Sequence, residues 1–285
     1  MNRVSFSQTF NAQPTQDGAG VKIRRVHHFG GRLDPFLMLD ELKASNEEDY
    51  IGGFPPHPHR GFETLTYLIH GGLTHEDSMG NRGEVHAGEA QWMSAGNGVI
   101  HSEMPLTDQQ GLHGFQAWIN LPARRKRDQP QYRDLKVSQM GQLKLAHWQF
   151  KAIAGQWSVD KTSVQSQQHQ LGEAASMADA QLEAQSQLTL QLPAGERLLI
   201  YVYQGQLNAA LQAGQLGVID PSEEARHLDL HSGTEESGFL LLRGKPLNEP
   251  IAHYGPFVMN NEAEIQQAIH DYQTGQLTQQ PSDIH

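Results

Sequence analysis

Two pairs of side chains that can ligate a metal lie in the first half of the chain. His57 and His59 are two residues apart, and so are His101 and Glu103. In a β-strand, residues i and i+2 leave the backbone on the same face. If both pairs lie in strands, each pair therefore directs two ligand atoms toward one side.

Three imidazole nitrogens and one carboxylate oxygen form a donor set for a first-row divalent ion. Such a set accepts iron, manganese, nickel, copper or zinc. The chain contains no cysteine, so thiolate metal sites, disulfides and thiol nucleophiles are excluded. Four protein ligands leave two positions of an octahedral ion open for water, substrate or dioxygen. A single His-x-His is more often incidental, but two pairs on expected strands favour metal binding.

The segments between the two pairs predict antiparallel strands. Apolar runs at 64–69, 73–79, 85–88 and 90–94 are separated by turns such as Gly71-Gly72 and Gly80-Asn81. Short strands joined by glycine-containing turns are typical of an antiparallel sheet or barrel. A meander of this kind folds the second pair back over the first, so all four side chains are expected to converge.

The second half of the chain repeats this rhythm without its chemistry. Alternating segments recur at 188–192, 197–203, 207–211, 217–220, 225–230 and 239–242. They contain neither His-x-His nor His-x-Glu, and His227 and His231 are interpreted as strand-edge residues. We therefore expect a second barrel that is structural or forms a partner surface. The Gln-, Ala- and Ser-rich segment 166–187 indicates no definite element.

The end of the chain predicts one α-helix. Asn261, followed three residues later by Glu264, is typical of a helix N-terminus. One apolar face follows, and Gly275 ends the pattern. That face consists of Ile265, Ala268, Ile269 and Tyr272. The tail 276–285 has the composition of a disordered segment.

Charge and composition exclude several classes of partner. A net charge of -11 argues against a general electrostatic contact with nucleic acid. The basic cluster Arg124-Arg125-Lys126-Arg127 is interpreted as a solvated loop rather than an address signal or a phosphate contact. Neither a signal-peptide pattern nor an apolar run of about 18 residues is present. We expect a cytoplasmic protein without membrane or direct nucleic-acid partners, and by default a monomer.

Several segments resemble the pirin family, a branch of the cupins. The resemblance covers most of the chain and is weakest between Ala154 and Gln187. It is carried by Phe54-Pro55-Pro56-His57-Pro58-His59-Arg60-Gly61-Phe62-Glu63-Thr64, His75-Glu76-Asp77, His101-Ser102-Glu103-Met104-Pro105, Gly244-Lys245-Pro246-Leu247-Asn248-Glu249-Pro250 and Gly255-Pro256-Phe257-Val258-Met259-Asn260.

The resemblance implies an all-β bicupin, with two antiparallel β-barrels of the jelly-roll type and a C-terminal α-helix. We expect an N-terminal metal-binding cupin barrel at residues 1–131. A degenerate cupin barrel without metal is expected at 132–259, and the C-terminal helix and tail at 260–285.

The resemblance also implies a ligand set and an activity. The implied metal ligands are His57, His59, His101 and Glu103, and the implied ion is iron, as Fe(II). Glu63 occupies the position at which general cupin motifs carry a ligand glutamate, and it is interpreted as an acceptor that orients a ligand imidazole. The implied activity is that of a quercetin 2,3-dioxygenase, with Glu103 as the catalytic base. The expected partners are a flavonol-like aromatic substrate and dioxygen.

An alternative function belongs to another class. Pirins are also described as transcription cofactors and as modulators of metabolic enzymes. The resemblance therefore equally implies a non-enzymatic, metal-dependent regulatory protein that binds a transcription factor or a metabolic enzyme. An enzyme consumes dioxygen with its substrate, whereas a regulator binds its protein partner without turnover. The pirin segments disfavour a third reading, a zinc-type sugar isomerase of the cupin fold.

Overall fold

A computed structural model describes residues 4–106 and 111–279 of the chain. The chain divides into two compact units. One unit comprises Pro14–Arg32, Phe36–Leu135 and Asn248–His285. We call it the histidine unit, because it contains the expected metal ligands. The second unit comprises Met1–Gln13, Leu33–Pro35 and Lys136–Leu247.

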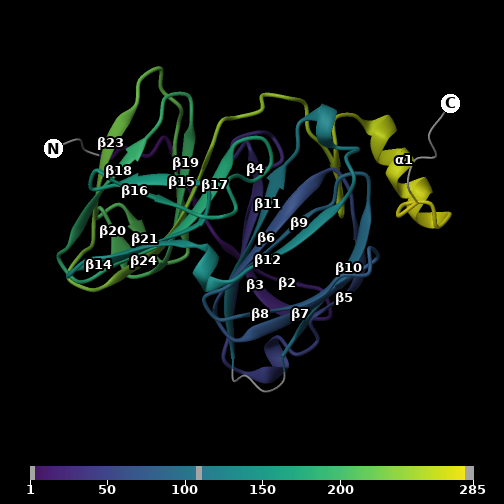
Figure 1. Cartoon of the computed structure of the whole chain (residues 1–285), viewed down its shortest axis with the longest axis horizontal. Coiled ribbons are helices and arrows are strands. Elements are labelled where there is room, and N and C mark those ends of the chain that lie inside the picture. Colours follow the sequence, from purple (N-terminus) through teal and green to yellow (C-terminus); the bar gives the residue numbers. More distant parts are fainter. Residues whose placement is uncertain (1–3, 107–110, 280–285) are drawn as a thin grey trace. The chain divides into compact units, whose positions relative to one another are not determined.

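The histidine unit contains a seven-stranded sheet and a four-stranded sheet, both antiparallel (Figure 1). The larger sheet has the order β12 (Gln131–Leu135), β9 (Ala90–Ser94), β6 (Phe62–His70), β11 (Leu112–Asn120), β4 (Phe36–Ala44), β3 (Val21–His27) and β2 (Gln13–Asp17). The smaller sheet has the order β5 (Phe54–His59), β10 (Val99–Pro105), β7 (Gly72–Asp77) and β8 (Arg82–His86). Two 3-10 turns, η1 (Glu47–Asp49) and η2 (Ala123–Arg125), lie in the connections.

The two sheets of the histidine unit pack face to face around apolar side chains. Leu42 and Leu68 of the larger sheet belong to one buried cluster with Leu73 and Val85 of the smaller sheet. Alternation along the strands produces this arrangement, because every second residue of a strand points to the same face. The space between the sheets is therefore the interior into which the expected ligands can point.

The second unit repeats the arrangement of seven and four strands. Its larger sheet has the order β1 (Gln8–Asn11), β22 (Gln215–Ile219), β19 (Arg197–Gln204), β24 (Ser237–Gly244), β17 (Ala175–Leu182), β14 (Trp148–Ala154) and β13 (Gly141–Lys144). Its smaller sheet has the order β16 (Thr162–Gln165), β15 (Gln156–Val159), β18 (Gln187–Leu192) and β23 (Arg226–His231). The pair β20 (Gln206–Leu207) and β21 (Leu211–Gln212) and the turn η3 (Val137–Gln139) complete it.

The expected fold class is confirmed: the chain is an all-β jelly-roll pair with a C-terminal helix. The sheets of each unit face one another and are not closed into barrels. Chain order and unit membership are interleaved, because β1 pairs with β22 of the second unit while β12 pairs with β9 of the histidine unit. The contiguous domain ranges 1–131, 132–259 and 260–285 stay a prediction.

The chain returns to the histidine unit at its C-terminal end. A hairpin of β25 (Ala252–Tyr254) and β26 (Phe257–Met259) precedes α1 (Glu262–Gln273). Asn261 caps the helix as expected, since its side chain accepts a hydrogen bond from the Glu264 amide. Of the expected tail, Leu277 is buried against the helix, so that part of the disorder prediction is wrong. Residues 280–285 lie outside the described part. Within the described part, no helix is both long enough and apolar enough to span a bilayer.

Two buried cations join this C-terminal segment to the strand that carries the histidines. Arg60 is fully buried, and its Nη1 lies 2.6 Å from Oδ2 of Asp271 on α1. Lys126 donates from Nζ to the Gly61 carbonyl at 2.7 Å and to the Val258 carbonyl at 3.0 Å. Lys126 is 1% exposed, so the solvated-loop interpretation is wrong for this member of the basic cluster. Three buried acceptors, the third being Asn120 Oδ1, replace the water that a surface lysine would bind.

We expect Asp271→Ala to lower the free energy of unfolding by about 3 to 5 kcal/mol, because Arg60 is left buried without its carboxylate. Burial would raise the pKa of Asp271, but hydrogen bonds from Arg60 and Gln267 outweigh it and lower the pKa. The contribution is therefore fully present above the ordinary aspartate range, about pH 4, and is lost as the pH falls below it. Urea denaturation at neutral and at low pH measures both effects.

The matched control is Asp128→Ala. Asp128 pairs with Arg125 at the surface, with side chains 41% and 24% exposed, so its removal should cost less than about 1 kcal/mol. Equal losses in the two variants, or a loss at Asp271 that persists unchanged at low pH, would show that the Arg60 pair does not hold the helix in place.

Candidate metal centre

Three of the four expected ligands converge in the histidine unit. β5 and β10 are antiparallel neighbours, and His101 lies opposite His57 in their register. His59, two residues after His57, joins them from the same strand. One candidate ligand atom from each imidazole lies within 4.8 Å of the other two. The ring centroids are 4.4 to 4.9 Å apart. In the described residues, this is the one group of three or more metal-ligating side chains with that spacing.

Hydrogen bonds assign the nitrogen that each imidazole offers. Nδ1 of His57 lies 2.8 Å from the Pro55 carbonyl, and Nδ1 of His59 lies 3.4 Å from the Pro256 carbonyl. Because a carbonyl only accepts, both Nδ1 atoms are assigned the hydrogen, and both Nε2 lone pairs remain free. Nε2 of His101 is buried and has no hydrogen-bond partner in the described part of the chain.

The electrostatic environment favours the neutral form of His59 and His101. Burial lowers the pKa of His59 and of His101 well below the ordinary histidine value, and the neighbouring histidines lower it further. A neutral imidazole with a free Nε2 lone pair is the form that ligates a metal. A buried nitrogen without a partner lowers the stability of the fold unless its lone pair binds an ion or accepts a hydrogen bond. The three histidines therefore form a site that suits a metal ion.

Glu103 lies in the same interior but outside the group of three. An extra residue in β5, between Phe54 and His57, shifts the register with β10, so that Glu103 lies opposite Phe54. Its carboxylate accepts from Thr66 Oγ1 at 3.0 Å and from Gln116 Nε2 at 2.7 Å. Both donors belong to the seven-stranded sheet, on the other side of the interior. The structure thus brings together the three histidines, and Glu103 as the fourth ligand stays a prediction.

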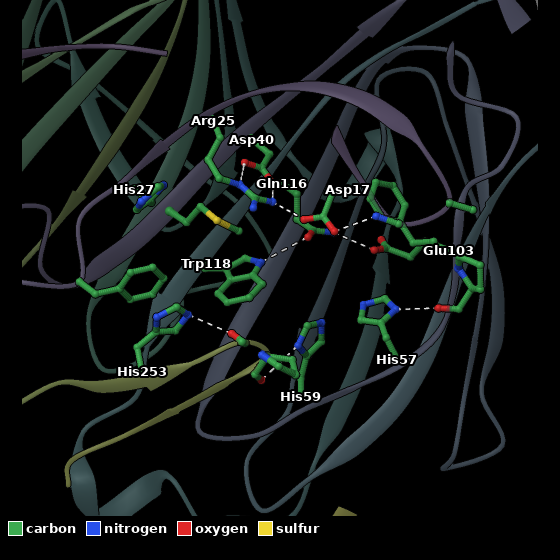
Figure 2. A pocket seen from close by; sticks show the side chains of 18 residues that line it. Asp17, Arg25, His27, Asp40, His57, His59, Glu103, Gln116, Trp118 and His253 are labelled. Carbon is green, nitrogen blue, oxygen red and sulfur yellow. Dashed lines mark hydrogen bonds and ion pairs between the residues drawn. The ribbon is translucent and has the colours of Figure 1, made fainter. Parts of the chain in front are cut away.

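A pocket of about 630 Å³ is lined by two of these histidines, His57 and His59 (Figure 2). Glu103 lies on the same side, and Trp118, Gln116 and Asp17 lie between this side and the Arg25–Asp40 pair (Figure 2). The apolar lining includes Phe29, Met38, Phe54, Pro55 and Trp118. The pocket therefore joins the candidate metal site to an aromatic wall and to a second polar end.

Sequence reasoning missed two groups at this site. Arg25 binds Asp40 through two hydrogen bonds, at 2.8 and 2.7 Å, and also contacts Asp17. These residues come from β2, β3 and β4, and no local pattern indicates that they share a pocket. The other group is His75 and Asp77, which contact each other behind His101. Their spacing on an expected strand is the same i and i+2 signal that identified the ligands.

Glu63 has partners of its own. Its carboxylate accepts from Trp92 Nε1 at 2.8 Å and lies 3.9 Å from Arg125 Nη2. The interpretation of Glu63 as an acceptor for a ligand imidazole stays a prediction.

The second unit fills the corresponding interior with leucines. β18 precedes β19 as β5 precedes β6, and β23 precedes β24 as β10 precedes β11. The inward side chains of β18 and β23 belong to the unit's hydrophobic core: Leu188, Leu190, Leu192, Leu228 and Leu230. His227 and His231 alternate with these leucines, on an edge strand, as expected.

Comparisons with known proteins agree with this architecture. The family model "Pirin" matches residues 20–119, and the model "Pirin C-terminal cupin domain" matches residues 177–278. A Vibrio cholerae protein named "Putative quercetin 2,3-dioxygenase" is 46% identical over 272 residues, 94% of this chain and 95% of that protein. A Pseudomonas aeruginosa protein of the same name is 42% identical over 275 residues, 93% of this chain and 94% of that protein. A crystal structure of quercetin 2,3-dioxygenase from Acinetobacter baumannii aligns with a TM-score of 0.82 at 30% identity, covering 95% of this chain and 97% of that one.

We expect His101→Ala to weaken the binding of Zn²⁺ by more than the roughly 10- to 100-fold that loss of an outer-shell partner costs. The reason is that the variant removes a ligand atom and not merely its support. Competition with a chromophoric chelator measures the affinity. His86→Ala, on an exposed part of β8, is the control and should bind as the wild type does. Wild-type affinity in the His101 variant would remove this residue from the ligand set.

Proposed function

The chain belongs to the pirin family, and we propose that it is a metal-dependent dioxygenase that cleaves a flavonol ring with dioxygen. The proposal is carried by one observation: three histidines cluster with a spacing that suits a metal ion, and two of them, His57 and His59, line a largely apolar pocket of about 630 Å³. Pockets of about 300 to 1,000 Å³ with a few polar groups are typical of small-molecule sites. The names of the bacterial relatives and of the Acinetobacter structure support the same reaction class.

Four residues are proposed to hold the ion: His57, His59 and His101 through Nε2, and Glu103 through its carboxylate. Iron as Fe(II) is the proposed ion, although manganese, nickel, copper and zinc also suit these donors. When bound, the ion supplies a Lewis acid for a substrate oxygen and a path for electrons between substrate and dioxygen. The protein contributes fixed imidazoles, a closed apolar wall and a base.

Glu103 is proposed as the base. Its carboxylate is 3% exposed and lines the pocket beside His57 and His59. The hydrogen bonds from Thr66 and Gln116 fix its orientation, and Trp118 Nε1 in turn donates to Gln116 Oε1 at 3.3 Å (Figure 2). In this role a Glu103 oxygen takes the proton of the flavonol 3-hydroxyl and leaves the negative charge on the substrate oxygen.

The other parts of the pocket suit a hydroxylated aromatic substrate. Trp118 and Phe29 offer flat apolar surfaces, and Phe29 is itself held by stacking on His253 at 3.6 Å. At the far end, Arg25 and Asp40 hold each other in a bidentate pair, which presents fixed donors and acceptors. An aromatic molecule with hydroxyl groups at both ends therefore matches the polar, apolar and polar order of the pocket.

Dioxygen uptake tests the activity directly. Iron-loaded protein is expected to consume dioxygen when quercetin is added, and the His101→Ala variant is expected not to, because it lacks a ligand for the ion. His86→Ala should behave as the wild type. An oxygen electrode records the uptake, and the metal content of each sample is measured beside it.

Absence of uptake by protein with stoichiometric iron would contradict the enzymatic proposal. The alternative, a metal-dependent regulatory protein without turnover, would then stand, and metal-dependent capture of a protein partner would be the next measurement. Uptake without iron, or uptake that survives His101→Ala, would contradict the proposed site.

Glu103→Gln separates the role of the base from that of a ligand. We expect turnover to fall by about 10²- to 10⁴-fold, the usual contribution of a positioned base, while iron binding falls much less. The amide keeps the size of the side chain and an oxygen acceptor for Thr66 or Gln116. Stopped-flow turnover and metal titration on the same samples give the two values. Parallel losses of both would assign Glu103 as a ligand alone.

A further inference from the structure

His101 differs from the other two candidate ligands in the partner of its Nδ1 atom, which is a side chain and not a backbone carbonyl. Nδ1 of His101 lies 3.4 Å from Nδ1 of His75, whereas His57 and His59 each contact a backbone carbonyl. His75 is fully buried on β7, the strand that pairs with β10 on the side away from β5. Its other ring nitrogen, Nε2, lies 3.1 Å from Oδ2 of Asp77. Asp77, His75 and His101 thus form a continuous row behind the candidate metal site.

The row is fixed at its outer end by the turn after β7. Oδ1 of Asp77 accepts from the amides of Met79 and Asn81, at 2.9 and 3.0 Å. Oδ2 faces Nε2 of His75 and also accepts from Asn81 Nδ2 at 2.9 Å. Burial would raise the pKa of Asp77, but hydrogen bonds from His75 and Asn81 outweigh it and lower the pKa. The ring of His75 is held in its plane by stacking on Tyr132, with centroids 4.3 Å apart and planes 20° apart.

The position of each hydrogen follows from the carboxylate. An ionised carboxylate only accepts, so Nε2 of His75 carries the hydrogen. When His101 ligates through Nε2, its hydrogen is on Nδ1, and Nδ1 of His75, 3.4 Å away, is the atom that accepts it. A neutral His101 therefore has its lone pair on Nε2, which is the buried atom without a partner in the described part.

We propose that Asp77 and His75 are positioning residues that fix His101 as the Nδ1–H tautomer and so present its Nε2 to the metal. The inference rests on the proposed metal site, but it does not depend on the proposed reaction. A second-shell carboxylate is a common way to orient a ligand imidazole. Here the carboxylate acts through a second imidazole, because Asp77 contacts His75 and His75 contacts His101.

Asp77→Asn is expected to reverse the direction of the hydrogen bonds along the row while keeping the size of the side chain. The Asn oxygen is required by the backbone amides of Met79 and Asn81, so its NH₂ group faces Nε2 of His75, and the Asn81 side-chain amide turns its oxygen toward the same NH₂ group. Two donors cannot face each other, and His75 must move its hydrogen to Nδ1. It then donates to Nδ1 of His101, which forces the hydrogen of His101 onto Nε2. A substitution two hydrogen bonds away along the row thereby blocks the nitrogen proposed to bind the metal.

Nitrogen NMR reads the tautomer directly in metal-free protein. Long-range proton–nitrogen correlation of ¹⁵N-histidine-labelled protein, above the ordinary histidine pKa range, distinguishes Nδ1–H from Nε2–H rings. We expect Nδ1–H for His101 in the wild type and Nε2–H in Asp77→Asn. An Nε2–H ring at His101 in the wild type, or an unchanged ring in the variant, would overturn the proposal.

Affinity for Zn²⁺ alone gives the second measurement. We expect Asp77→Asn and His75→Leu to bind Zn²⁺ about 10- to 100-fold more weakly than the wild type. His75→Asn should restore most of the affinity, because the Asn oxygen can occupy the place of Nδ1 and accept from His101. Asp49→Asn is the matched control, since Asp49 pairs with the exposed Lys22.

If His75→Asn loses as much affinity as His75→Leu, His75 has a packing role only. This result would overturn the proposal that the row orients His101. Thermal unfolding of each variant shows whether Asp77→Asn destabilises the turn after β7. If it does, the comparison of His75→Leu with His75→Asn still tests the proposal. Neither readout measures turnover. Failure of the dioxygenase proposal and failure of the proposal that the row orients His101 are therefore distinguishable.

Discussion

The antiparallel register of β5 with β10 is the constraint on which the site depends. It places His101 opposite His57, and the two-residue period of the strand adds His59 on the same face. A slip of β5 by one residue would turn His57 and His59 to the face opposite that of His101. The register is fixed immediately after His59, where Gly61 has a φ of +88° and passes so close to Val258 that a Cβ atom would lie 2.0 Å from its carbonyl oxygen. A residue with a side chain cannot make that turn, so the end of β5 is fixed by backbone geometry.

The two units share one arrangement of strands but carry different side chains on the faces that point inward. In the second unit the inward positions of β18 and β23 carry leucines, which fill the interior and contribute burial without any polar cost. In the histidine unit the corresponding strands carry imidazoles, whose nitrogens must each find a partner. The backbone arrangement of seven and four strands tolerates both. The chemistry therefore resides in a few side chains, and the frame alone does not determine it.

Local pattern explains which parts of this structure could be predicted. Alternation and turn glycines indicated the strands around the histidines, and the Asn261 cap indicated the helix, because these signals act within a few residues. The strand β17 was not indicated, since its sequence ASMADAQL has small residues at buried positions in place of β-branched ones. The burial of Lys126 was also missed: its acceptors include the Val258 carbonyl, 132 residues away. His75 and Asp77 have the same two-residue spacing as the candidate ligands. Their contact with His101 could not be predicted, because it depends on the pairing of β7 with β10.

The residues that contact one another at the site differ widely in their separation along the sequence. His57 and His101 meet through strands of one meander, whereas His59 contacts Pro256 across 197 residues and Arg60 contacts Asp271 across 211. Contacts between such distant residues must first overcome the entropy of closing a long loop. The carbonyl that fixes His59 and the carboxylate that holds Arg60 therefore arrive only when the C-terminal segment has docked. The pairing of β5 with β10 places His57 opposite His101, whereas the carbonyl that orients His59 comes from the C-terminal segment of the histidine unit.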